Sequence, residues 1–479
     1  MYIECPCWQG LTHKSISPCT DCPDPHQEYT CLAPFPKKRP HRFEKGSKRL
    51  WLSPQIPVRE TLGEDEVRIG KAGLALCLFV AALMALPVSV VGGQNNHGDV
   101  QKDWTLLMYW DTDNSLEICT EFALSTWEES LPSNADVNIV ALVDLLSADG
   151  TWIWEIVDGQ RHLVDTWDEL NTSDPAVLEM FVEYGMTEFP AEKTLLVLQD
   201  HGYSWRGICQ DETNGDLLMP IDGVRSALES AKADMGNGVD VLAFDACNMM
   251  LLEVVYELSD VVPYIVGSQT TVSYDGLPYE LFIPDLVANP DMSPAELAVD
   301  IVYDYAEYYS SKWDYSHMFR YNQDFAPACA VDTSRLDALG DAFGRLCTVL
   351  QPIIQDHMKT IEDARGYSLI GQWANMAGWE WTPDIGTFVK GLREISGHPE
   401  LAAAIDEFEI AYDVAVIAED HSKRYHDTVT GLSFWFPPSL AQYNSMGYYY
   451  CQQFVYHDIG LDLVAETSWV DCLMTYYGS

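Results

Sequence analysis

The sequence predicts an α/β protein with a mostly parallel β-sheet sandwiched by helices and a mainly helical C-terminal region. From Trp104 to about Pro290, apolar runs of strand length alternate with helical patterns, which is typical of parallel sheets. These runs are almost continuously apolar, which indicates strands buried on both faces. After about Pro290 the helical pattern predominates.

The individual elements can be assigned in order along the chain. Five apolar runs are expected to form the sheet, and a hairpin is expected after the second of them. A further apolar run near the end of the chain, "GLSFWFP", is expected to be a strand. The expected strands are residues 104–110, 137–145, 193–202, 239–247, 263–270 and 431–437, with the hairpin at 151–167, and the expected helices are 115–131, 174–186, 222–235, 293–309 and 332–364.

Composition restricts the class of protein and of partner. The chain has 479 residues, 47% of them hydrophobic, so it can bury a large core and is not a disordered protein. It carries 27 Lys and Arg against 73 Asp and Glu, a net charge of -46. Such a surface repels nucleic acid and anionic membranes and suits cationic ligands, although solubility alone also explains it. No nucleic-acid partner is therefore expected.

The N-terminal part differs from the rest. Residues 73–91 are uncharged and apolar, follow two basic residues and precede "GGQNNHGD", the pattern of a secretory signal, although residues 72–91 could also stay as a membrane anchor. Either way, a secreted or cell-envelope location is expected. The Cys-rich residues before this segment are either a metal-binding cytoplasmic head or sequence absent from the natural product, and the second is favoured. The expected domains are 1–66 (Cys-rich), 67–93 (signal or anchor), 94–290 (catalytic core) and 291–479 (mainly helical region).

Two reactive side chains follow predicted strands. His201 comes directly after "LLVLQD", and Cys247 comes after "VLAFDA" at the predicted start of a helix. Ligand sites of parallel sheets lie at the carboxyl ends of the strands, where the helix dipole and a nearby imidazole would activate a thiol. The N–H groups of Gly202 and Cys247 could form an oxyanion hole. A lone buried cysteine is usually inert packing, so the prediction depends on the two residues together.

Several segments in this order resemble the clostripain family of cysteine peptidases, which has a caspase-like fold. They are "WTLLMYWDTDNSLE", "FPAEKTLLVLQDHGYSWRG", "LAFDACNMMLLEVVYEL", "YIVGSQTTVSYDGLPY" and "GLSFWFP". The resemblance implies that His201 and Cys247 are the catalytic dyad. It also implies an endopeptidase that cleaves after Arg or Lys through a thioester intermediate. A catalytically silent caspase-like binding module with an acidic surface is the alternative.

The resemblance also assigns substrate-binding residues. Asp245 matches the acid that selects Arg or Lys before the cut, and Asp275 in "SYDGLPY" resembles a second acid of that pocket. Strand alternation places Asp245 and Cys247 on the same side of the sheet. Asp245 could instead cap the following helix.

No cofactor is assigned, and calcium binding stays open. Asp111, Asp113 and Asn114, and the loop "DETNGD", carry oxygen ligands of the kind that calcium binds, and calcium supports some clostripains. No complete calcium-binding loop is present, so no residue is assigned as a metal ligand. The expected partners are proteins or peptides with Arg or Lys before the cut, and membrane contact is expected only through an N-terminal anchor. Residues 207–224 contain no Lys or Arg, so self-cleavage there is not expected.

Overall fold

The computed structural model describes most of the chain beyond residue 100. The described residues belong to one unit, Lys71–Ser479. Both N-terminal segments singled out above lie outside them, and the expected boundary near residue 290 stays a prediction. No helix in the described part is long and apolar enough to cross a bilayer. The described residues are 101–130, 135–311, 326–369, 381–422, 429–445, 448–449, 452–453 and 455–479.

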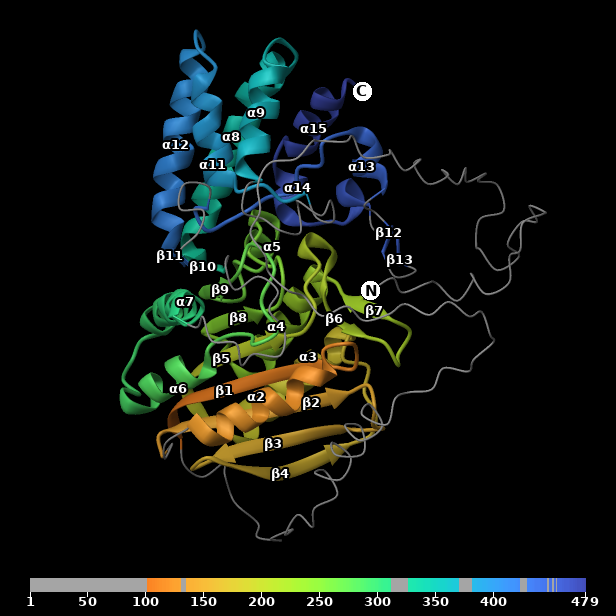
Figure 1. Ribbon diagram of the computed structural model, residues 1–479, viewed down its shortest axis with the longest axis vertical. Helices are drawn as coiled ribbons and strands as arrows, with labels where there is room; N and C mark the ends of the chain where they lie inside the picture. Colours follow the sequence, from red (N-terminus) through yellow and green to blue (C-terminus); the bar gives the residue numbers. More distant parts are fainter. Residues whose placement is uncertain are drawn as a thin grey trace, which may run out of the picture. The chain divides into compact units, whose positions relative to one another are not determined.

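A nine-stranded mixed sheet lies at the centre of this fold (Figure 1). In their order across the sheet, the strands are β11 (Val416–His421), β10 (Pro327–Asp332), β9 (Tyr264–Gly267), β8 (Val241–Asp245), β5 (Ala191–Gln199), β1 (Lys102–Thr112), β2 (Val137–Leu145), β3 (Thr151–Val157) and β4 (Gln160–Trp167). The five strands from β9 to β2 are parallel, and β3 and β4 form the expected hairpin. Alternate residues of β1 belong to two buried clusters on opposite faces, which explains its continuous apolar sequence.

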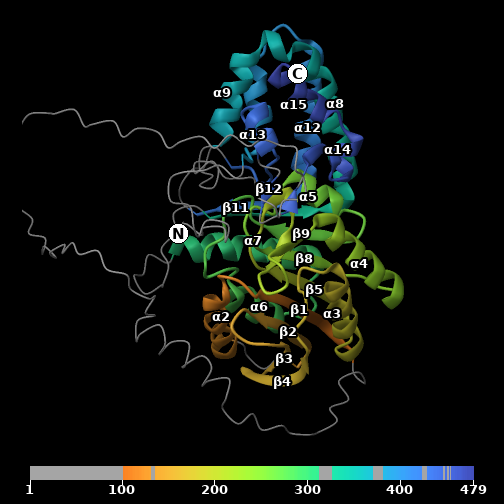
Figure 2. The same cartoon turned by 90° about the vertical axis from the view of Figure 1, so that its right-hand side faces the viewer.

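Helices cover both faces of the sheet (Figure 2). One face packs against α3 (Pro175–Glu188), α4 (Ile221–Met235) and α5 (Leu252–Glu257), and the other against α2 (Glu117–Ser130), α6 (Tyr279–Ala288) and α7 (Pro294–Ser311). Helix α3 begins where the Asp174 carboxylate accepts a hydrogen bond from the Ala176 N–H at 3.0 Å. Helix α4 ends at Gly236, which has a φ of 78°. The predicted layered α/β architecture is therefore confirmed.

The later helices gather beyond the β11 edge of the sheet (Figure 1). Their aromatic side chains continue the core of one face, since Phe343 and Phe434 lie in ring contact with each other and with Trp469. The short pairs β6 (Ile208–Asp211) with β7 (Leu217–Met219), and β12 (Tyr448–Tyr449) with β13 (Gln452–Gln453), lie outside the main sheet. The helices are α8 (Leu336–Leu350), α9 (Met358–Ser368), α11 (Ile385–Gly391), α12 (Pro399–Ala415), α13 (Leu440–Ser445), α14 (Asp462–Glu466) and α15 (Trp469–Tyr477).

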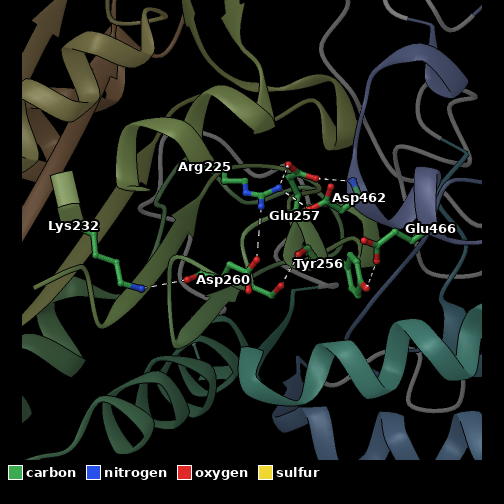
Figure 3. Close-up of polar contacts among 8 residues, drawn as sticks. Arg225, Lys232, Tyr256, Glu257, Asp260, Asp462 and Glu466 are labelled. Carbon is green, nitrogen blue, oxygen red and sulfur yellow. Dashed lines mark hydrogen bonds and ion pairs between the residues drawn. The ribbon is translucent and has the colours of Figure 1, made fainter. Parts of the chain in front are cut away.

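A partly exposed polar group joins the C-terminal helices to the core (Figure 3). Arg225 of α4 contacts Glu257 of α5 at 3.1 Å and Asp462 of α14 at 2.6 Å. Tyr256 of α5 donates a hydrogen bond to Glu466 of α14 at 2.8 Å. Because the Glu257 side chain is only 2% exposed, the Arg225 charge compensates a carboxylate that would otherwise be buried alone.

Two features differ from the sequence prediction. Residues 431–437 are not a strand, because Ser433 forms only isolated bridges, to Leu251 and Asp384. Their apolar side chains are buried against helices, and a short apolar run does not distinguish such a segment from a strand. Conversely, the C-terminal region contributes β10 and β11, which extend the sheet in antiparallel fashion and were not predicted.

Candidate active site

The loops that carry His201 and Cys247 meet at the carboxyl edge of the sheet. Strands β5 and β8 are parallel, and their last paired residues are Gln199 and Asp245. His201 and Cys247 each follow two positions after these residues, so they lie at the same level of the sheet edge. Gly202 packs directly on the Cys247 backbone. A Cβ atom at Gly202 would collide with the Cys247 carbonyl oxygen and lie 3.0 Å from its nitrogen. Only glycine permits this contact. The loop of His201 therefore lies directly beside the loop of Cys247.

His201 has a hydroxyl neighbour that the sequence did not identify. Its Nε2 lies 3.0 Å from the Oγ of Ser115, which belongs to the loop between β1 and α2. Burial lowers the pKa of His201 to about 4, so the imidazole is neutral at neutral pH and can accept a proton. Ser115 also follows a strand end, so the rule that located His201 could have found it.

Cys247 differs from the other described cysteines. All six described cysteines after residue 100 are free thiols, and Cys247 is the one among them that is half-buried. The Val272 N–H donates a hydrogen bond to its Sγ at 3.3 Å, and the thiol donates to the Val272 carbonyl oxygen at 3.9 Å. The prediction that Cys247 lies at a helix start is wrong. A loop follows β8, and α5 begins only at Leu252, so the helix dipole does not act on the thiol.

The backbone at Gly202 is compatible with the predicted oxyanion hole. Gly202 forms an isolated antiparallel bridge with Ile208. The hydrogen bond of this bridge runs from the Tyr203 N–H to the Gly207 carbonyl oxygen at 3.0 Å. The bridge therefore does not use the Gly202 N–H, which is the group that the predicted oxyanion hole requires. The role of Gly202 stays a prediction.

Asp245 lies beneath the thiol loop and is 4% exposed. Its Oδ2 accepts a hydrogen bond from the Tyr279 hydroxyl at 2.7 Å, and the Leu277 N–H also donates to the carboxylate. Burial nevertheless raises the pKa of Asp245 to about 6, because the two hydrogen bonds offset only part of the lost solvation. The helix-cap alternative is wrong, since α5 has Leu251 at its N-cap and no side-chain capping bond.

Asp275 lies in the loop that covers Asp245. The next residue, Gly276, has a φ of 69°, and a Cβ atom there would approach the Asp245 Oδ2 to 2.5 Å. Both carboxylates act on the same neighbour, the Cys119 thiol. Burial, followed by the charges of Asp245 and Asp275, raises the pKa of Cys119 to about 12. The structure therefore brings Asp245 and Asp275 to one region, and their substrate roles stay predictions.

Acidic side chains near the same sheet edge could hold a metal ion. Asp113, Asp144 and Glu169 each offer a carboxylate oxygen, and these atoms lie within 4.8 Å of one another. The Asn114 side chain is hydrogen-bonded through both its nitrogen and its oxygen. Its amide nitrogen donates to Asp200 at 2.7 Å, and its oxygen accepts from the Leu116 N–H.

Comparisons with known proteins identify the family and the fold. The sequence profile of the clostripain family matches residues 108–473. Clostripain from Hathewaya histolytica is 27% identical over 202 residues, which cover 36% of this chain and 38% of that relative. A secreted C11 cysteine protease from Bacteroides thetaiotaomicron, solved with an irreversible peptide inhibitor, has a TM-score of 0.58 at 21% identity and covers 77% of this chain and 99% of its own. An inactive zymogen C11 protease from Parabacteroides distasonis has a TM-score of 0.51 at 19% identity, covering 79% and 98%. The chain therefore belongs to the clostripain family of cysteine peptidases.

Proposed function

We propose that the protein is an extracytoplasmic cysteine endopeptidase that cleaves proteins or peptides after Arg or Lys. The observation that carries the proposal is the packing of Gly202 on the Cys247 backbone, which brings the imidazole and thiol loops together above buried Asp245. Membership of the clostripain family supports the peptidase activity.

In the first half of the reaction, the Cys247 sulfur attacks the carbonyl carbon before the scissile bond. His201 takes the thiol proton and passes it to the leaving amine, so that an S–C bond forms and the C–N bond breaks. Burial lowers the pKa of His201 to about 4, so the imidazole is neutral and its lone pair is free at neutral pH. The Gly202 and Cys247 N–H groups stabilise the oxyanion.

In the second half, water attacks the thioester carbonyl. His201 accepts a proton from this water and returns one to the sulfur, and the S–C bond breaks to release the carboxylic acid and restore Cys247. Ser115 holds the imidazole during both halves through its contact with Nε2. Ser115 is therefore a positioning residue.

Specificity for a basic residue follows from two carboxylates in a confined space. Asp245 is almost fully buried and Asp275 is half-buried in the loop above it. A guanidinium group entering this space would pair with Asp245 and recover the solvation energy that the carboxylate lost on folding. The buried charge thus favours a cation and disfavours an uncharged side chain of the same shape.

The proposed location rests on the apolar residues 73–91 and on a relative. The Bacteroides thetaiotaomicron protease of similar fold is described as secreted. Release by a signal peptidase would give a mature chain beginning near residues 92–95, whereas an anchored form would retain the apolar segment.

Hydrolysis of an arginyl amide tests the proposal. The parent protein should release amine, and Cys247→Ala should reduce the rate to background. Cys119→Ala is the matched control, because its thiol lies near the same carboxylates but has its pKa raised to about 12 by burial and their charges and stays protonated. If Cys247→Ala cleaved as fast as the parent, the proposed mechanism would be wrong. If the parent did not cleave, the chain would be a silent binding module.

A further inference from the structure

Two histidine rings face each other in the C-terminal helical region, away from the site described above. The Nε2 atoms of His357 and His398 lie 3.0 Å apart. The rings are perpendicular, with their centroids 5.0 Å apart, and both residues are half-buried. The two residues are 41 positions apart in the sequence, so the fold and not a local motif brings them together. We call these two residues the histidine pair.

Helix starts hold both residues of the histidine pair in place. His357 lies between the short 3-10 helix Gln351–Asp356 and α9, and its carbonyl oxygen accepts a hydrogen bond from the Ile361 N–H at 3.1 Å. His398 directly precedes α12, and its carbonyl oxygen accepts from the Ala402 N–H at 3.1 Å. Because both backbones are fixed in this way, little conformational freedom is lost when the two rings bind one ligand together.

The spacing of the two nitrogens matches two ligands of one transition-metal ion. A zinc–nitrogen bond is about 2.0 to 2.1 Å long, so two imidazole nitrogens on one ion lie about 2.9 to 3.4 Å apart for bond angles between square and tetrahedral. The same arrangement places the ring centroids about 4.5 to 5.3 Å apart. The observed distances of 3.0 Å and 5.0 Å both lie within these ranges.

Without a metal ion, the histidine pair is held by one hydrogen. A neutral imidazole has one nitrogen that donates and one that accepts, so one Nε2 carries a hydrogen and the other presents a lone pair. When a metal ion takes the place of this hydrogen, the donor ring carries its hydrogen on Nδ1 instead, through exchange with water. Both Nε2 lone pairs then bind the ion, and no proton is released overall.

The surroundings of the histidine pair favour a cation. Asp356 and Glu400 flank the pair in sequence and are exposed, and Lys359 forms an ion pair with Asp363. The whole chain has a net charge of -46, which raises the concentration of cations near its surface. Among the described residues, no third His, Cys, Asp or Glu joins the pair at ligand spacing, so water molecules would complete the coordination.

We propose that His357 and His398 bind one divalent transition-metal ion of the class that prefers imidazole, such as zinc, nickel or copper. Calcium and magnesium prefer oxygen ligands and are not expected at this position. The ion would tie the start of α9 to the start of α12 and stabilise this part of the fold. Its binding needs neither His201 nor Cys247, so the proposal does not depend on the peptidase mechanism.

Protection of histidines from chemical modification tests the proposal on the full-length, EDTA-treated protein. Diethyl pyrocarbonate modifies accessible neutral imidazoles, and peptide mass spectrometry locates each modified ring. Saturating zinc chloride should slow the modification of both His357 and His398 at least about tenfold, and magnesium chloride should not. His162, which is exposed on β4, is the internal control, and its modification rate should stay the same with zinc.

Zinc binding by variants, measured by equilibrium dialysis, gives a second readout. His357→Gln and His398→Gln should each bind one zinc ion fewer per chain than the parent, whereas His162→Gln should bind as many as the parent. The proposal is overturned if zinc leaves both rings of the histidine pair as reactive as before, or if both of their variants bind as many zinc ions as the parent. The protection experiment uses the parent chain, so misfolding of a variant cannot imitate its result.

Discussion

Cleavage after Arg should weaken in acid because Asp245 becomes protonated. Burial raises the pKa of Asp245 to about 6, so its negative charge is present above that pH and is lost as the pH falls through it. The charged fraction falls about tenfold between about pH 7 and about pH 5, and kcat/KM for an arginyl amide should fall by about the same factor. The pKa of His201 is lowered to about 4, so the imidazole stays mostly neutral over this range and does not produce this change.

A substrate with citrulline in place of Arg distinguishes protonation of Asp245 from protonation of His201. Citrulline has the shape of Arg without its charge, so its slow cleavage gains nothing from a charged Asp245. Its kcat/KM should not fall between about pH 7 and about pH 5, and the Arg-specific fall should disappear in Asp245→Asn. Equal falls for the arginine and citrulline substrates would refute the reasoning, because a catalytic group would then be titrating.

Three further predictions concern neighbouring parts of the structure. Tyr279→Phe removes a hydrogen bond that lowers the pKa of Asp245, so the acid limb for arginyl substrates should move up by roughly one pH unit, as pH profiles of kcat/KM would show. Ser115→Ala should lower kcat about tenfold with little change in KM, while Ser115→Thr keeps the hydroxyl and most of the rate. A protein that begins at Gln94 should fold and cleave, because both members of the proposed dyad lie in the described fold beyond residue 100, and circular dichroism with amide hydrolysis checks this.

The sequence predicted the elements whose patterns arise from burial. Strands β1, β2, β5, β8 and β9 were found because parallel strands are buried on both faces and are almost wholly apolar. Strands β10 and β11 were missed because they adjoin helical stretches, and because most side chains of β11 are only half-buried. Residues 431–437 were mistaken for a strand because their side chains are buried in the same way.

The site was predicted as far as local patterns allowed. His201 and Cys247 follow strand ends, and parallel pairing of β5 with β8 brings their loops together. The thiol's true neighbour, Val272, could not be predicted, because the contact depends on the path of a loop after β9. The grouping of acidic side chains was equally hidden, since Asp144 and Glu169 come from chain segments far from Asp113 and carry no shared motif.

Covalent labelling with a chloromethyl ketone that bears Arg tests the central claim most directly. The reagent should place one adduct on each chain, and peptide mass spectrometry should locate it on the sulfur of Cys247, with chloride displaced. Cys119→Ala should still be labelled and Cys247→Ala should not. An adduct on any other residue in the parent, or an unlabelled parent that still hydrolyses an arginyl amide, would contradict the assignment of Cys247 as the nucleophile.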